Sequence, residues 1–412
     1  MPSPPPARPD ALEAFLHYGF VPAVPPDLAA RPWAAPPGPP LPDDEERCLA
    51  AGLAALEAAF ADVPPGPQVV PLSGGLDSRV ILGMLVAAGA RERIQAVTFG
   101  TPGTLDFELA TAVARAAGVR HERIDLTREP LDAPGLRAAL PPGGPWTHAF
   151  EAHFNALVPR RFGAGATLWS GILANVINGS RVGDPHEDWA AARRSYARHY
   201  GAVRSGRLTR PGFDAAASLP EAPLLAHGTL TYEEQLHLGV HYPSRFERVL
   251  LAPGFAFRTP FAEPPWVAFA LRLPRALRLG ERAFRAVIRR RLPELMALPT
   301  KTCHGVPLSA PAWRLGLARQ RRRVARRLRR LSPWAPWGPA PEANYLAFDL
   351  ELRRPSPARA VVQGCLARLA ARRVVDWLDL DELWTRHQRR RANLADALVL
   401  LAELELNLSA AE

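Results

Sequence analysis

The first half of the chain alternates short strand-like runs with amphipathic stretches, and this alternation predicts βαβ units. Four runs are predicted strands: Gln68–Leu72, Ile94–Phe99, Arg120–Leu126 and Ala166–Trp169. Four stretches are predicted helices: Glu46–Phe60, Ser78–Ala88, Leu105–Ala117 and Phe150–Val158. Strands that alternate with helices form a parallel sheet covered on both faces. We therefore expect a doubly wound α/β fold whose ligand binds beyond the carboxyl ends of the strands.

The pattern changes on either side of this segment. Residues 1–45 are rich in proline and contain one apolar stretch, Ala11–Val21, which predicts an arm with a short helix lying on a neighbouring part. Beyond about residue 190 no strand pattern remains, and the chain is predicted to be mainly helical. These shifts divide the chain into the arm, an α/β core over 46–195 and a helical carboxyl-terminal part over 196–412.

The composition predicts a folded cytoplasmic protein. Hydrophobic residues make up 48% of the chain and charged residues 22%, which is ordinary for a globular protein. No run of eighteen apolar residues occurs, and the first residues lack the pattern of a secretory signal. The three cysteines, Cys48, Cys303 and Cys365, are too few and too scattered for a disulfide framework or a zinc site.

The formal charge of +11 raises the question of nucleic acid. Only one of the 51 basic residues is lysine and prolines number 45, so a genome-wide codon bias explains the charge better than a nucleic-acid footprint. The basic run Arg319–Arg330 predicts a helix that buries an apolar stripe, Leu317, Val324 and Leu328, and leaves its basic face in solvent. RNA binding is the alternative reading of this run.

The sequence PLSGGLDSRV follows the first predicted strand and opens a helix. Gly74 and Gly75 allow the backbone to turn sharply and to approach a ligand, and the helix after them favours phosphate. Ser73 and Ser78 add hydroxyl donors, whereas Asp77 suits the magnesium ion that accompanies ATP. The loop is neither a Walker loop, which needs GxxxxGK[ST], nor a GxGxxG dinucleotide fingerprint.

SGGLDS resembles the pyrophosphatase loop of the asparagine synthetase family of ATP pyrophosphatases. Further resemblances to that family are found in FLHYGFVP at Phe15–Pro22, in Val97–Leu126, in WSGILANVINGS at Trp169–Ser180, in Phe257–Pro274, in LPTKTCHGVP at Leu298–Pro307 and in LVLLAELELNL near the carboxyl end. The resemblance implies a sheet of the adenine nucleotide alpha-hydrolase type and an ATP-dependent ligase that forms an amide.

The resemblance also implies roles for individual residues. The phosphates of ATP and the Mg²⁺ ion would be held by Ser73, Gly74, Gly75, Asp77 and Ser78. The adenosine would be faced by Leu72, Phe99, Ser170 and Gly171. Lys301 would offset the charge that develops as pyrophosphate leaves, and Asn175 occupies the position of a metal-binding aspartate.

Lys301 is also singled out by the residues alone, because it is the only lysine in the chain. Arginine is a wide planar fork, whereas lysine is a compact point charge on a flexible stem. A confined site in which a phosphoryl group develops charge accepts the second and excludes the first. The competing explanation is a chance survivor on a surface loop.

The chain departs from the family pattern in three ways. No amino-terminal cysteine nucleophile precedes the synthetase region, so the amine is expected to be ammonia, a substrate amine, or a product of a separate amidotransferase or pathway partner. Ile172 stands where the family has glutamate, and Asn175 where it has aspartate, which puts aspartate-to-asparagine conversion in doubt. This variant resembles the asparagine synthetase-like proteins of exopolysaccharide and modified-peptide clusters. Arg79 replaces a frequent serine and is expected either to reach a phosphate or to be solvated.

Other candidates have structural alternatives. Arg258 and Glu263 lie where the family has an acidic residue beside the cleft, or form a structural ion pair. Asp106 is expected to cap a helix, although it follows the second strand at the ligand end. His304 could assist as an acid or base, and His387 is expected to be a packing residue.

We therefore expect an enzyme that joins a carboxylate to ATP, releases pyrophosphate and lets an amine displace AMP. Two other classes stay open at this point: an adenylating enzyme that modifies tRNA, and a non-catalytic nucleotide-binding subunit. The charge suggests the first, although paired catalytic cysteines are missing, and Ile172 and Asn175 suggest the second.

Overall fold

The centre of the molecule is a five-stranded sheet, in which every strand pairs in parallel with its neighbours in the order β3-β2-β1-β4-β5. The computed structural model describes residues 9–140, 146–163, 165–183, 185–204, 206–250, 256–331 and 338–410. The strands are β1 (Gln68–Pro71), β2 (Ile94–Gly100), β3 (Arg120–Asp125), β4 (Thr167–Trp169) and β5 (Ala256–Arg258).

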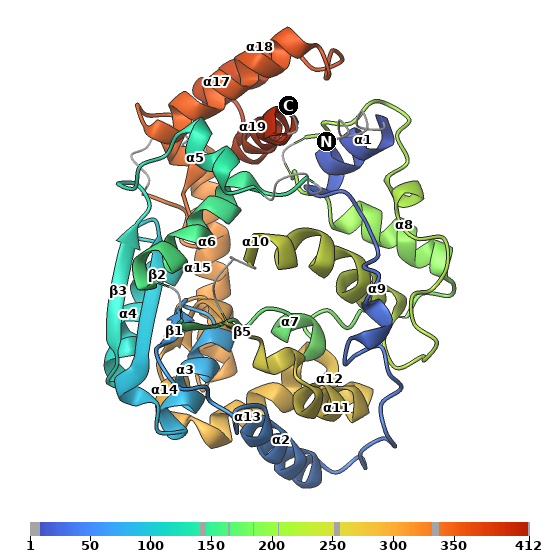
Figure 1. The fold of residues 1–412 in the computed structure, drawn as a ribbon, viewed down its shortest axis with the longest axis vertical. Helices are drawn as coiled ribbons and strands as arrows, with labels where there is room; N and C mark the ends of the chain where they lie inside the picture. Colours follow the sequence, from blue (N-terminus) through green and yellow to red (C-terminus); the bar gives the residue numbers. More distant parts are fainter. Residues whose placement is uncertain are drawn as a thin grey trace.

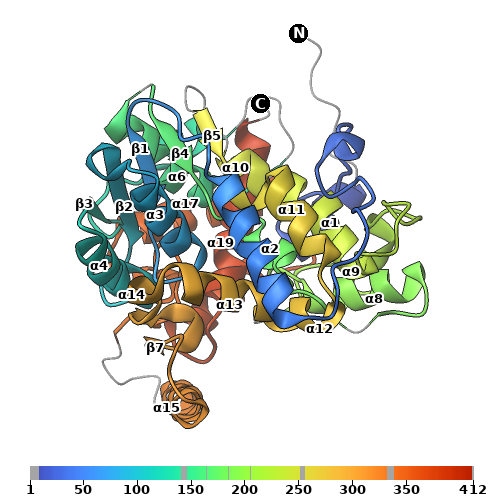
Figure 2. The same ribbon diagram turned by 90° about the horizontal axis from the view of Figure 1, so that it is seen from below.

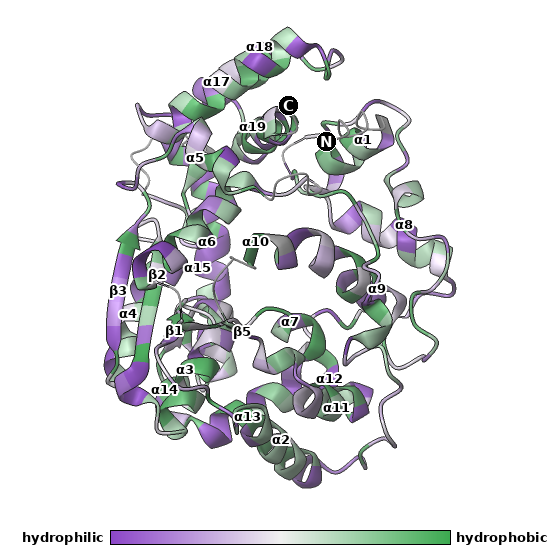
Figure 3. Ribbon diagram, in the orientation of Figure 1, coloured by the Kyte–Doolittle hydropathy of each residue, from purple (hydrophilic) through white to green (hydrophobic). Residues whose placement is uncertain are grey.

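Adjacent strand residues point into two different hydrophobic cores. Val70 and Ala96 belong to one core, and their neighbours Val69 and Val97 belong to the other. This division follows from the two-residue period of a strand and requires cover on both faces. The edge strand β3 is hydrophilic in Figure 3, and Ile124 is its one fully buried residue.

Helices cover both faces of the sheet (Figure 1). The first core contains residues from α2 (Glu45–Ala59), α3 (Asp77–Ala87), α4 (Leu105–Ala117), α11 (Pro264–Arg272) and α13 (Arg282–Arg291). The second contains residues from α5 (Ala133–Ala138), α6 (Ala149–Phe162), α17 (Pro357–Arg372) and α19 (Ala395–Ala410). The predicted doubly wound α/β fold is therefore confirmed.

The other helices surround these layers or join them. They are α1 (Pro9–Tyr18), α7 (Ala174–Ile177), α8 (Trp189–His199), α9 (Tyr232–Leu236), α10 (Arg248–Leu250), α12 (Arg275–Arg278), α14 (Pro293–Met296), α15 (Ala312–Leu331), α16 (Phe348–Glu351) and α18 (Leu380–Gln388), with a π-helix over His237–Glu247. No helix in the described ranges is both long enough and apolar enough to cross a bilayer.

The strand order creates one topological switch point. From β1 the chain moves outward through β2 to β3, whereas β4 pairs with the opposite side of β1. Ligands of open α/β sheets bind where the order reverses, outside the carboxyl ends of the strands. The loop after β1 and the loop after β4 meet at that point.

Several sequence predictions agree with the observed elements to within a few residues. The predicted strands correspond to β1–β4, and the predicted helices correspond to α2, α3, α4 and α6. The amino-terminal arm contains the predicted helix, α1, whose Phe15 is fully buried in the second core. Residues 1–8 of the arm lie outside the described residues.

The expectation that the carboxyl-terminal part contains no strands is wrong. Strands do not stop near residue 190, because β5 joins the sheet and β6 (Pro299–Thr300) pairs with β7 (Val306–Pro307). These strands have three residues or fewer, which is too short for a two-residue period to be visible.

Helix α15 forms as predicted but does not bury its apolar stripe. Leu317, Val324 and Leu328 are 42%, 52% and 47% exposed. Figure 2 shows α15 end-on, set apart from the rest of the fold. An amphipathic pattern predicts a helix with an apolar face, but it does not supply the neighbour that covers that face.

Candidate active site

The loop between β1 and α3 is closed by its two serines. The Ser73 N–H donates to Ser78 Oγ over 3.1 Å, the two hydroxyl oxygens are 3.0 Å apart, and the Gly75 N–H donates to Ser73 Oγ over 3.2 Å. Leu76, which precedes helix α3, provides no side-chain cap. Among the described residues no side chain caps the first N–H groups of this helix, which leaves them available to an anion.

Two glycines are required by close approaches. A Cβ on Gly74 would lie 2.7 Å from the Leu105 carbonyl oxygen, and a Cβ on Gly171 would lie 2.6 Å from the Asp77 Cβ. Gly171 begins the turn after β4, so its contact with Asp77 joins the two loops of the switch point. Any residue larger than glycine at position 171 would push these two loops apart.

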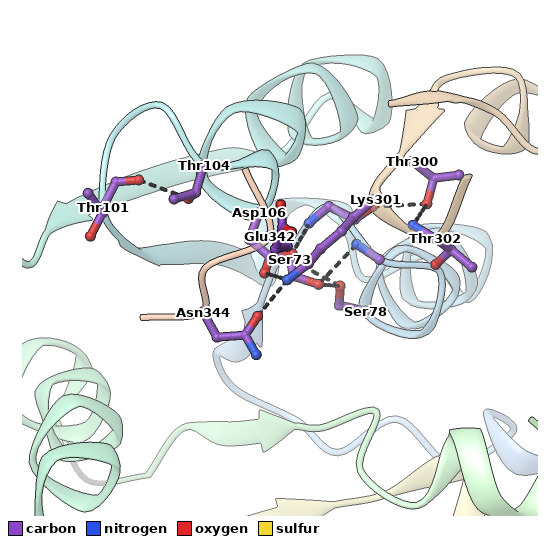
Figure 4. A network of polar contacts seen from close by, with 12 residues as sticks. Ser73, Ser78, Thr101, Thr104, Asp106, Thr300, Lys301, Thr302, Glu342 and Asn344 are labelled. Carbon is purple, nitrogen blue, oxygen red and sulfur yellow. Dashed lines mark hydrogen bonds and ion pairs between the residues drawn. The ribbon is translucent and has the colours of Figure 1, made fainter. Parts of the chain in front are cut away.

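The lysine loop is bonded directly to the β1 loop (Figure 4). The Lys301 N–H donates to the Gly74 carbonyl over 2.7 Å, and Thr300 Oγ1 donates to the same oxygen over 3.0 Å. The Lys301 ammonium donates to Asp106 and to Asn344. Two segments more than 220 residues apart in the sequence are thus brought together.

Asp106 is not the cap of α4, contrary to expectation. The capping position belongs to Thr104, and the Asp106 carboxylate instead accepts the Gly74 N–H over 3.1 Å through one oxygen and the Lys301 ammonium through the other. Its place in the first turn of α4 brings the carboxylate to the ligand edge of the sheet, where the Gly74 N–H and the Lys301 ammonium are available as donors. Asp106 therefore fixes the loop and the lysine relative to each other.

The Asp77 carboxylate has no hydrogen-bond donor or counter-ion among the described residues. Burial raises the pKa of the Asp77 carboxyl to about 7, and repulsion by Glu281 acts in the same direction. Glu281 accepts from Arg285 over 3.0 Å and has a left-handed backbone, with φ of 63°. Nothing in the sequence pattern indicated that Glu281 would lie near the loop.

The other predicted nucleotide residues differ in their surroundings. Ser170 continues β4, and its N–H donates to the Arg258 carbonyl over 2.9 Å. Leu72 is buried at the end of β1. Phe99 stacks on Tyr345, with ring centroids 5.7 Å apart.

The departures from the family pattern lie in the turn after β4. Ile172 is partly buried, and the Asn175 side chain is exposed and makes no hydrogen bond within the part of the chain that the structure describes. Leu173 adopts a left-handed backbone, with φ of 69°, between them.

A segment of the carboxyl-terminal part, residues 341–347, contributes to the site and was missed by sequence reasoning. The Leu105 N–H donates to the Pro341 carbonyl over 2.8 Å, and Thr101 Oγ1 donates to the Tyr345 carbonyl over 3.1 Å. Asn344 lies between these anchors and accepts from Lys301. The segment has neither a helix nor a strand period before α16, so no sequence signal marked it.

Arg79 neither reaches a phosphate site nor is solvated, so both expectations for it are wrong. It is fully buried and donates to the carbonyls of Leu295, Leu298 and Pro299 over 2.9, 3.0 and 2.7 Å. Burial lowers the pKa of the Arg79 guanidinium to about 10. The side chain connects the first turn of α3 to the chain that leads into Lys301.

The remaining candidates have structural contacts. Arg258 lies 3.0 Å from Asp62 and 3.9 Å from Glu263, which agrees with the ion-pair interpretation. His387 is fully buried, as expected of a packing residue, and burial lowers its pKa to about 3.

His304 accepts from Arg322 over 2.7 Å, and burial, followed by the nearby arginines, lowers its pKa. Within the described ranges no three or more His, Cys, Asp or Glu side chains are grouped as a metal site. Any divalent cation here would need oxygen ligands from a bound nucleotide in addition to Asp77.

Comparison with known proteins identifies the segment that builds the loop. The family model described as asparagine synthase matches residues 54–140, which contain β1, α3, β2, α4 and β3. No curated protein matches the chain. A domain of this family supports an ATP-dependent ligase that forms amides. Residues 54–140 thus carry the asparagine synthase domain signature, and the resemblance to a synthetase domain of the asparagine synthetase family is confirmed over that segment.

Proposed function

We propose that the protein adenylates a substrate carboxylate with ATP and passes the acyl group to an amine. One observation carries this proposal: the only lysine of the chain is bonded through its backbone to Gly74, and its ammonium lies beside the same loop. A phosphate at the start of α3 would therefore lie near both a helix amino terminus and a compact cation.

In the proposed reaction, a carboxylate oxygen attacks the α-phosphorus of ATP, and the bond to the bridging oxygen of the β-phosphate breaks. Pyrophosphate leaves, and its charge is stabilised by the first N–H groups of α3, the Ser73 and Ser78 hydroxyls and Lys301. An amine then attacks the acyl carbon, loses a proton and displaces AMP. Ammonia, an amine substrate or a separate amidotransferase partner can supply the nitrogen.

Asp77 fits a magnesium ion that arrives with the nucleotide. Its carboxylate has no counter-ion in the described residues, and burial together with Glu281 disfavours its charge. Mg²⁺ is bound in such sites by one or two carboxylates together with substrate phosphates, and it would neutralise charge on the departing pyrophosphate. Asn175, the other expected ligand, could add an uncharged amide oxygen.

The proposal is tested by exchange of labelled pyrophosphate into ATP, measured with a panel of carboxylates. We expect exchange with at least one carboxylate and AMP, rather than ADP, as the nucleotide product. Lys301→Arg should reduce exchange by about a hundredfold or more, because the wider fork does not fit beside Gly74. Arg198→Lys, an exposed substitution on α8, is the control and should leave exchange unchanged.

Two results would contradict the proposal. ATP binding without exchange for any carboxylate would favour the non-catalytic subunit. Full exchange in Lys301→Arg would show that the ammonium is not needed for pyrophosphate release. Equal melting temperatures of the two variants and the unchanged protein would confirm that either result concerns the site and not the fold.

A further inference from the structure

A groove of about 1230 Å³ runs along α15, and it is separate from the contacts that hold the Lys301 ammonium. One wall is α15, and the opposite wall is formed by residues 340–342, 349–353 and 390–393. We call it the α15 groove. Its end reaches Leu105 and His304.

The α15 groove is strongly basic. Eight arginines line it, against two carboxylates, Glu342 and Asp349. Both carboxylates are already paired, the first with Arg322 over 3.3 Å and the second with Arg353. Positive charge therefore remains in excess along the whole wall, which favours an acidic occupant.

Arg321 contributes to this excess of positive charge. It lines the α15 groove, is exposed, and makes no ion pair with any described residue. Arg323, two residues further on, is also exposed but does not line the groove. Successive helix residues point about 100° apart, so the two guanidinium groups leave α15 on different sides.

An exposed apolar stripe follows the edge of the α15 groove. Trp313 and Leu317 line the groove and are 65% and 42% exposed. Val324 and Leu328 continue the stripe at spacings of seven and four residues and are about half exposed. Side chains at these spacings share one side of a helix, so the stripe presents a continuous apolar surface.

We propose that the α15 groove binds an acidic amphipathic segment of a partner polypeptide. Its carboxylates would pair with the groove arginines, and its apolar side chains would cover the stripe, in the manner of a helix laid into a groove. RNA would satisfy the arginines but leave three aliphatic side chains exposed. A second copy of the chain would bring two arginine-lined surfaces together, which like-charge repulsion opposes.

The proposal is tested by fluorescence anisotropy with the intact chain. The probe is a labelled synthetic peptide of about twenty residues that forms an amphipathic helix, with leucines on one face and glutamates on the other. We expect Arg321→Glu to weaken binding about tenfold or more, and the control Arg323→Glu to change it less than about twofold. The two variants differ only in which side of α15 carries the reversed charge.

A second pair of measurements tests the apolar stripe. The double substitution Leu317→Ser, Val324→Ser changes only exposed positions and should also weaken the peptide by about tenfold. Polyglutamate of the same length, which offers charge without apolar side chains, should bind more weakly than the peptide. No ATP is needed, so the outcome is independent of the proposed adenylation.

Three results would overturn the proposal. Equal losses in Arg321→Glu and Arg323→Glu would show a diffuse charge effect with no groove specificity. Tighter binding of tRNA than of the peptide, with the stripe variant unaffected, would assign the surface to RNA. Self-association that the stripe variant abolishes, together with no peptide binding, would assign it to a second copy.

Discussion

Asp106 accepts hydrogen bonds from two donors that belong to different parts of the chain. One oxygen takes the Gly74 N–H and the other takes the Lys301 ammonium, so a single carboxylate sets the position of the loop and the cation together. Charge-assisted hydrogen bonds are shorter and stronger than neutral ones, which makes this an effective connection. Asn344 shares the ammonium and adds a third segment to the arrangement.

Asp77 differs from Asp106 because no described residue neutralises it. The pKa of the Asp77 carboxyl is about 7 in the folded chain, against an ordinary value of 3.8. The unfolded chain therefore releases this proton at lower pH, and stability falls as the pH rises between these two values. Above about pH 7 the whole cost of burying the charge is present.

We expect Asp77→Asn to raise the melting temperature by several degrees at pH 8 and to leave it almost unchanged at pH 4. The amide is nearly the same size as the carboxyl, so the substitution removes mainly the buried charge. The control is Glu221→Gln, which makes the same chemical change at an exposed position. Thermal unfolding of all three proteins across this pH range checks the prediction. A gain in melting temperature that is equal at pH 4 and pH 8 would contradict it.

Helix α3 and the lysine loop are joined as elements by Arg79. Its three hydrogen bonds satisfy carbonyls over Leu295–Pro299, immediately before Lys301. Since α3 also begins at the β1 loop, one helix positions both sides of the proposed phosphate site. The side chain acts through the lysine loop and is a positioning residue.

We expect Arg79→Met to destabilise the protein by about 2–4 kcal/mol, because it leaves buried carbonyls without donors. The lysine loop should also exchange its amide hydrogens faster, and kcat for pyrophosphate exchange should fall more than KM for ATP rises. Arg79→Lys retains a cation with fewer directed donors and should restore part of kcat. A lower melting temperature with unchanged amide exchange at residues 300–303 would restrict Arg79 to a purely structural role.

At the scale of elements, the sequence predicted the positions of helices and strands, because these depend on the local pattern of residues. Both ends of α4 agree with the prediction, and its carboxyl-terminal end was predictable because Gly118 adopts the left-handed conformation that ends a helix. The uses of Arg79 and Asp106 could not be predicted, because both depend on partners more than 190 residues away or on another loop. The exposed stripe of α15 was misassigned for the same reason: its pattern specifies a face and not a neighbour.

At the scale of the whole molecule, the sheet is built from both sides of the predicted boundary at residue 195. β5 comes from the carboxyl-terminal part and pairs with β4 through Thr167–Trp169. The lysine loop and residues 341–347 come from the same part and complete the switch point. The motifs located these pieces along the chain, but only the fold shows that they meet.

The first core also depends on helices from both sides of residue 195. A Cβ on Gly52 in α2 would lie 2.5 Å from Val287 in α13 and 2.7 Å from Phe269 in α11. Helix α2 therefore packs closely against two helices that lie beyond residue 195. Removing them would expose the apolar face of α2 and part of one face of the sheet to water.

We therefore expect the isolated fragment 46–195 not to fold, although it contains the whole segment matched by the family model. It should lack a cooperative thermal transition and bind a hydrophobic dye, since α11 and α13, which pack on α2 in the first core, are missing. Fragment 9–410, which omits only residues outside the described ranges at the two ends, is the matched control and should unfold cooperatively like the full chain. A dispersed NMR spectrum and a cooperative transition for fragment 46–195 would show that the α/β core is an independent domain. In that case the carboxyl-terminal part would complete the site without being needed for the fold.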